Sequence, residues 1–124
     1  MAVPILKQGD YLIATIQSAL TDTGVLELRD DLADRVGRSR SRGIIIDVTA
    51  LDVIDSFVAR FLRTIALTAR LRGAETVIVG IQPDVAVAMV QFQLDLAPLE
   101  TALDLDEALA LLGQRSANGH VAQR

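Results

Sequence analysis

The sequence predicts a single small α/β domain, in which a mixed β-sheet packs against about four helices. Its length of 124 residues and its 51% apolar content suit one domain with a hydrophobic core. Continuous runs of β-branched residues alternate with segments whose apolar residues recur at helical spacing. Strands buried on both faces and joined by helices pair in parallel, through right-handed crossovers. Together these observations predict an α/β sandwich.

The N-terminal third predicts a hairpin followed by a helix. Residues 3–6 and 11–16 are β-rich, and the turn residues 8–10 separate them, which favours an antiparallel hairpin. The capping residues 21–24 come next. Apolar residues at helical spacing then predict a helix that runs to about Val36.

The middle of the chain predicts a buried strand, a loop and a long helix. Residues 44–48 are continuously apolar or β-branched apart from Asp47, as in a strand covered on both faces. A loop over residues 49–54 leads to Asp55 and Ser56, which open the helix. Gly73 is placed to end it.

The C-terminal part predicts two further strands and two helices. These elements are a buried strand, a helix that begins near Pro83, a short edge strand and a last helix, over residues 76–79, 83–92, 99–101 and 104–112. Val85, Met89 and Phe92 form the apolar side of the helix after Pro83. We expect Gly113 to close the last helix, so that residues 1–113 form the domain and residues 114–124 a polar tail.

The composition excludes several classes of function. The chain has no cysteine and one histidine, His120, which argues against disulfides, thiolate metal sites and a histidine-based catalytic triad. A net charge of −4 gives no general attraction for nucleic acid or anionic lipid. No apolar run is long enough to span a bilayer, and residues 1–10 do not resemble a secretion signal. We therefore expect no nucleic-acid or membrane partner and a cytoplasmic location.

Two candidate ligand sites each have a simpler interpretation. A phosphate could approach the helix N-terminus after the turn at residues 80–83, but the glycine-rich nucleotide signatures are absent and a tight turn explains the same residues. Asp47, Asp52 and Asp55 could hold Mg²⁺ or act as acid and base, but turn hydrogen bonding and helix capping are the simpler roles. The prediction is therefore no metal, no cofactor and no catalytic residue.

Ser56 has two interpretations at the start of its helix. Either it caps the helix, as serine and aspartate commonly do, or it is a phosphorylation site. The positive end of the helix dipole would stabilise a phosphoryl group there, and Arg60 lies on the same helical face. Arg60, Arg63 and Arg70 are either solubilising charges or a docking stripe for an acidic partner.

Four segments resemble the STAS family, the fold of anti-sigma-factor antagonists, and within it the RsbS-type scaffold of the bacterial stressosome. These segments are residues 4–7, 54–59, 80–87 and 101–105, and the resemblance covers residues 3 to about 113. It implies a non-enzymatic scaffold that assembles with RsbR-type sensor paralogues through STAS domains. It also implies that the particle holds an RsbT-type serine kinase, which phosphorylates Ser56 and departs, and that a dedicated phosphatase resets the serine.

The resemblance assigns a kinase-binding surface to Asp55, Ser56, Phe57, Arg60 and Arg63. Residues 91–94 depart from the leucine-glycine pair expected after the third helix. Ala88 and Met89 stand where an RsbR-type paralogue carries a second phosphorylated threonine, which favours the single-site RsbS type. Two alternatives stay open, namely a free antagonist that binds an anti-sigma kinase directly and a small α/β nucleotide-binding domain or enzyme.

Overall fold

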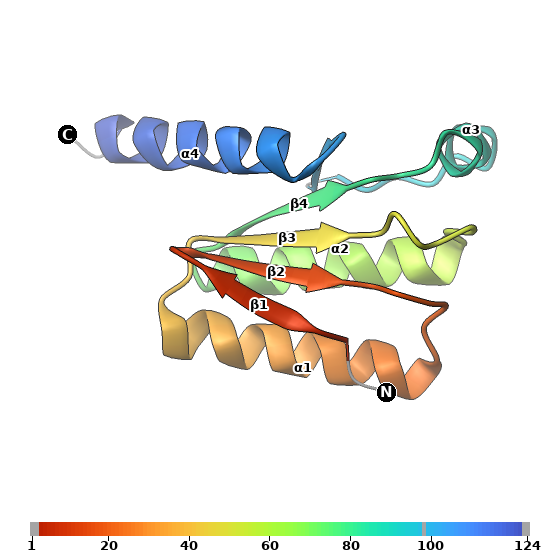
Figure 1. Cartoon of the computed structure of the whole chain (residues 1–124), viewed down its shortest axis with the longest axis horizontal. Helices are drawn as coiled ribbons and strands as arrows, with labels where there is room; N and C mark the ends of the chain where they lie inside the picture. The colour runs from red at the N-terminus through yellow and green to blue at the C-terminus, as the bar shows by residue number, and fades with distance from the viewer. Residues whose placement is uncertain (1–2, 98, 123–124) are drawn as a thin grey trace.

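The computed structural model describes residues 3–97 and 99–122, with side chains to residue 114. It confirms the mixed α/β architecture of a five-stranded sheet and four helices over these residues (Figure 1). In chain order the elements are β1 (Ile5–Gln8), β2 (Tyr11–Thr15), α1 (Asp22–Ser39), β3 (Gly43–Asp47), α2 (Ser56–Leu71), β4 (Glu75–Val79), α3 (Pro83–Gln91), β5 (Glu100–Ala102) and α4 (Leu105–Ala122).

The strand order in the sheet is the order in the chain, from β1 to β5. β1 and β2 form the predicted antiparallel hairpin, and each later neighbouring pair is parallel. The carboxyl ends of β2, β3 and β4 therefore lie at one edge of the sheet. The loops that precede α2 and α3 meet at this edge, and this is where Ser56 lies (Figure 1).

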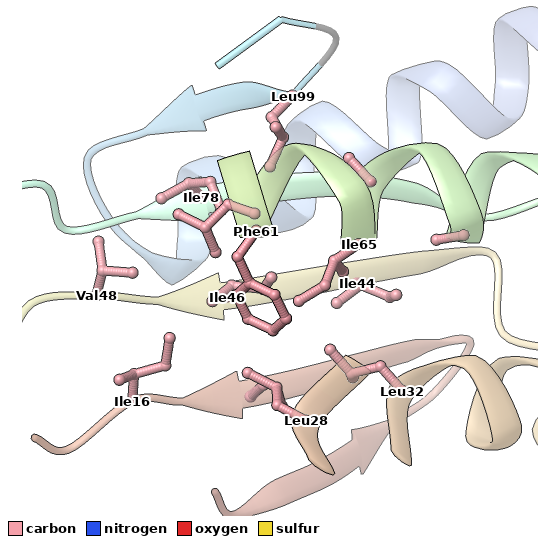
Figure 2. Packing of buried hydrophobic residues seen from close by; sticks show 14 of the residues in the cluster. Ile16, Leu28, Leu32, Ile44, Ile46, Val48, Phe61, Ile65, Ile78 and Leu99 are labelled. Carbon is pink, nitrogen blue, oxygen red and sulfur yellow. The ribbon is translucent and has the colours of Figure 1, made fainter. Parts of the chain in front are cut away.

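Helices cover the sheet on both faces. α1 and α2 pack side by side on one face, and α4 lies against β3, β4 and β5 on the other (Figure 1). β3 is buried on both sides, because Ile44 and Ile46 face α1 and α2 while Ile45 belongs to the cluster under α4. Figure 2 shows the larger cluster, in which Phe61 and Ile65 of α2 lie over Ile44 and Ile46.

Three predicted element boundaries were wrong. α1 continues past Val36 to Ser39, because Gly37 is tolerated inside a packed helix and the chain turns only at Arg40, which has a φ of 50°. β1 covers residues 5–8 instead of 3–6, because a two-residue turn at Gly9 and Asp10 sets the hairpin register. Phe92 lies just beyond α3 and is 75% exposed, so it does not continue the apolar side formed by Val85 and Met89.

The predicted end of the last helix was also wrong. α4 does not stop at Gly113 but runs to Ala122, through most of the segment predicted to be a tail. Gly113 does not adopt the positive φ of a helix-ending glycine, and no proline follows it. A helical glycine costs only about 1 kcal/mol relative to alanine, which one position in a long helix can absorb. Residues 123–124 of the predicted tail lie outside the described residues.

Candidate functional site

The loop between β3 and α2 is held by a short turn at the end of β3. The Asp47 carboxylate accepts hydrogen bonds from the backbone N–H of Thr49 at 2.9 Å and from the Thr49 hydroxyl at 2.6 Å. Leu51 and Ile54 are each 5% exposed and anchor the loop in the core. These contacts therefore fix the position of the start of α2.

Asp55, and not Ser56, caps α2. The Asp55 carboxylate accepts a hydrogen bond from the backbone N–H of Val58 at 2.9 Å, and Asp55 has the extended backbone of an N-cap residue. Ser56 is the first helical residue and is exposed. Within the described residues its hydroxyl makes no hydrogen bond. The capping interpretation of Ser56 is thus wrong, because Asp55 holds the cap and the Ser56 side chain is exposed.

The exposed face of α2 carries the predicted arginines in different roles. Arg60, one turn after Ser56, is exposed and has no acidic partner in the part of the chain that the structure describes. Arg63 donates from Nε to the carbonyl of Ala97 at 3.1 Å, which ties α2 to the segment before β5. Arg70 approaches Glu75 at 3.9 Å near the far end of the helix. Arg60 is therefore the arginine best placed to pair with a group on Ser56.

Exposed apolar side chains lie on either side of Ser56 in the chain. Phe57 is 44% exposed. Val53, which sequence reasoning missed, is 69% exposed in the preceding loop. The signal that could have found Val53 is its place between the two buried residues Leu51 and Ile54, since the turn between them points outward. Exposed apolar residues beside a free hydroxyl and an unpaired arginine are typical of a protein-binding surface.

The turn before α3 packs against the loop of the site. The Gln82 amide donates to the carbonyl of Thr49 at 2.7 Å and to the Asp52 carboxylate at 3.4 Å. Gly80 has a φ of +81°, and a Cβ built there would overlap the Thr49 hydroxyl. The tight-turn interpretation of this segment is the one that the geometry supports.

The three aspartates of the suggested metal site each have a structural partner. Asp47 accepts from Thr49, Asp52 from Gln82, and Asp55 from the N–H of Val58. Among residues 3–97 and 99–114, whose side chains the structure describes, no group of acidic residues is arranged to hold a metal ion. Over residues 3–97 and 99–122 no helix has the length and hydropathy of a membrane-spanning segment.

A family model described as "STAS domain" matches residues 2–108. The chain belongs to the STAS family. The match ends within α4, so the last part of that helix lies beyond the residues that define the STAS domain. The observed sheet of five strands with helices on both faces is the STAS fold, as the sequence resemblance predicted.

Two solved structures are similar to this chain over nearly its whole length. A serine-to-glutamate variant of RsbS from Moorella thermoacetica is 36% identical with a TM-score of 0.78, over 93% of this chain and 97% of that one. A chain from a structure of the stressosome, described as a signal integration and transduction hub, is 35% identical with a TM-score of 0.72. That match covers 91% of this chain and 98% of the other.

A curated relative is longer than this STAS chain. The RsbT co-antagonist protein RsbRA of Bacillus subtilis (strain 168) is 29% identical over 82 residues, which is 66% of this chain. The match spans only 30% of RsbRA. The similarity is thus to one part of a co-antagonist and to the full length of an RsbS chain.

Proposed function

We propose that this STAS protein is a non-enzymatic scaffold subunit of a stressosome, which holds an RsbT-type serine kinase and releases it when Ser56 is phosphorylated. The observation that carries the proposal is the free, exposed hydroxyl of Ser56 beside a separate capping residue, Asp55. The similarity to RsbS and to a stressosome chain supports the assembly part of the proposal. The similarity to RsbRA supports an RsbR-type STAS paralogue as the partner in the particle.

The site can accept a phosphoryl group without losing its fold. Phosphorylation adds about −1.5 to −2 charges at neutral pH. The N-terminus of α2 carries the positive end of a 16-residue helix dipole, and its first turn contains no acidic residue. Arg60, four residues after Ser56, can turn its unpaired guanidinium to the phosphate. The Asp55 cap to Val58 does not involve the Ser56 hydroxyl and stays in place.

The same charge disrupts a bound kinase. In this proposal the kinase covers Asp55, Ser56, Phe57, Arg60 and Arg63, with Val53 at the rim. A phosphoryl group inside that contact is a desolvated and mismatched charge, which costs several kcal/mol by the general rules of interfaces. Each 1.4 kcal/mol changes the affinity about tenfold, so phosphorylation weakens kinase binding by more than tenfold. A cognate phosphatase then resets Ser56, and all of these events take place in the cytoplasm.

The test is to phosphorylate the protein with an RsbT-type kinase and ATP, map the modified residue by mass spectrometry and measure kinase affinity by calorimetry. We expect modification at Ser56 and at least about tenfold weaker kinase binding by the phosphorylated protein. Ser56→Ala should keep the kinase bound. Ser39→Ala, which removes a serine at the far end of α1, is the matched control and should change neither result.

Two outcomes would contradict the proposal. One is modification confined to serines other than Ser56. The other is equal kinase affinity for the unmodified and phosphorylated proteins when circular dichroism shows both to be folded. Either result would show that Ser56 is not the release switch.

A further inference from the structure

The arginines of this acidic protein are not all neutralised. Five of those that the structure describes lie within salt-bridge distance of a carboxylate, namely Arg29, Arg35, Arg38, Arg42 and Arg70. Four others in the described ranges do not: Arg40, Arg60, Arg63 and Arg72. Arg60 and Arg63 belong to the Ser56 surface. Arg40 and Arg72 lie at the opposite end of the sheet and have no role in the proposed switch.

Arg40 and Arg72 line an open cleft between the ends of α1 and α2. Both helices end on the side of the molecule away from Ser56, at the left in Figure 1. The cleft there has a volume of about 540 Å³, and Ser41, Arg42 and Leu71 also line it. This volume lies within the range of small-molecule binding sites.

Two backbone features hold the arginines at the cleft. Arg72 crosses the last turns of α1 directly over Gly37, where a Cβ would overlap the Arg72 guanidinium. Arg40 occupies the left-handed conformation that ends α1, with a φ of 50°, where glycine or asparagine is the less strained choice. Arg40 thus places a long, positively charged side chain at a position whose backbone conformation favours a small residue.

The two guanidinium groups are not consumed by capping the helices. The carbonyl of Val36, at the end of α1, accepts the backbone N–H groups of Arg40 and Ser41. The carbonyl of Ala69, at the end of α2, accepts those of Arg72 and Ala74. In the described part of the chain neither guanidinium makes a hydrogen bond. Their positive charges therefore oppose the partial negative charge that the two helix ends place at the cleft.

The floor and rim of the cleft add further polar groups. Ser41 is only 4% exposed, and its hydroxyl has no hydrogen-bond partner among the described residues. Arg42 reaches Asp10 at 3.9 Å, a loose and exposed pair that an anion can replace. A buried hydroxyl without a partner is uncommon in folded proteins, and this one adds a polar group beneath the lining of the cleft.

We propose that this cleft binds a phosphate-bearing small molecule through Arg40 and Arg72. Planar guanidinium groups recognise phosphate oxygens by paired, charge-assisted hydrogen bonds, and two unpaired ones at a single cleft suit a ligand with more than one charge. Arg42 supports them from the rim. The cleft is separate from Ser56. A small molecule therefore binds at the end of the domain away from the kinase surface.

The experiment titrates the full chain with pyrophosphate, ATP and inorganic phosphate by calorimetry, at low salt and without magnesium. We expect pyrophosphate to bind with a dissociation constant below about 1 mM and more tightly than inorganic phosphate. ATP binding more tightly than pyrophosphate assigns the cleft to a nucleotide, and equal binding assigns it to a polyphosphate group. Absence of binding by all three probes at 5 mM, roughly five times that limit, overturns the proposal.

Variants separate the cleft from general attraction to positive charge. Arg72→Gln and Arg40→Asn should each weaken pyrophosphate binding about tenfold, and asparagine tolerates the backbone conformation of residue 40. Arg38→Gln is the matched control, because it removes the same charge from the end of α1 but from a side chain paired with Asp34 outside the cleft. Equal weakening by the control would show that net charge alone attracts the anion and would overturn the assignment.

Discussion

At the residue scale, two neighbours at the start of α2 have separate tasks. Asp55 satisfies the backbone N–H of Val58, and Ser56 leaves its hydroxyl exposed. The sequence predicted a capping role for the pair without separating them, because both residue types cap helices and their spacing to the helix differs by one position. The extended backbone of Asp55, just outside the helix, and the hydrogen bond that its carboxylate accepts from Val58 together assign the cap.

The separate roles of Asp55 and Ser56 predict different losses in the free energy of unfolding when each is replaced. Asp55→Ala removes the cap and should lower the free energy of unfolding by about 1 kcal/mol. Ser56→Ala should change it by less than about 0.5 kcal/mol, because the serine hydroxyl makes no hydrogen bond within the described residues. Urea denaturation followed by circular dichroism measures both. A larger loss for Ser56→Ala than for Asp55→Ala would reverse the assignment of the cap.

Other residues of the site were within reach of sequence reasoning only in part. Arg60 and Arg63 were both predicted to be solubilising charges or part of a docking stripe, and both are exposed. Helical spacing gave no means to foresee that Arg63 bonds the carbonyl of Ala97, a contact 34 residues away in the chain. The bond between Gln82 and the carbonyl of Thr49 was equally out of reach, since it depends on how two loops meet at the sheet edge.

At the element scale, the strands and helices were predicted in type and order. Periodicity identifies the two-sided burial of β3 and the apolar side of α2, because each depends on side chains a few residues apart. The ends of α1 and α4 were predicted too early at Gly37 and Gly113. A glycine can end a helix or lie inside one, and the choice depends on the packing of the following turns.

The continuation of α4 can be tested at Gly113. A Cβ at this position meets no atom within 4 Å, and the residue lies inside the helix. Gly113→Ala should therefore stabilise the protein by roughly 0.5 to 1 kcal/mol, measured by urea or thermal unfolding. Gly73→Ala is the contrasting control, because Gly73 has a φ of +87° and should lose stability on substitution. Destabilisation by Gly113→Ala would place a helix end there after all.

At the scale of the whole molecule, the two faces of the sheet are covered unequally. α1 and α2 cover one face, while the other is covered by α4 over β3, β4 and β5. β1 is the outermost strand on one side of the sheet, and its Leu6 is 63% exposed. Leu103, before α4, is 81% exposed. Exposed apolar side chains and an edge strand favour association with other STAS domains.

This coverage leads us to expect dimers or larger species, and large particles in the presence of an RsbR-type paralogue. Sedimentation velocity at micromolar concentration measures this directly. Leu6→Lys should raise the monomer fraction if β1 takes part in the contact, and Lys7→Gln, one residue along the same strand, controls for a general change of charge. A monomer that persists with the paralogue present would instead favour the free-antagonist alternative.

The separation of Asp55 from Ser56 also has a consequence for how long a signal lasts in the cell. The rate at which a folded protein is degraded often follows the fraction of molecules that are transiently unfolded. The stability of the protein sets that fraction. The cap of α2 does not use the Ser56 hydroxyl, so adding a phosphoryl group leaves the main contact at the helix start intact. Phosphorylation should then not shorten the half-life of the protein. The lifetime of the phosphorylated state after a stress would be set by the rates at which the phosphate is added and removed, and not by protein turnover.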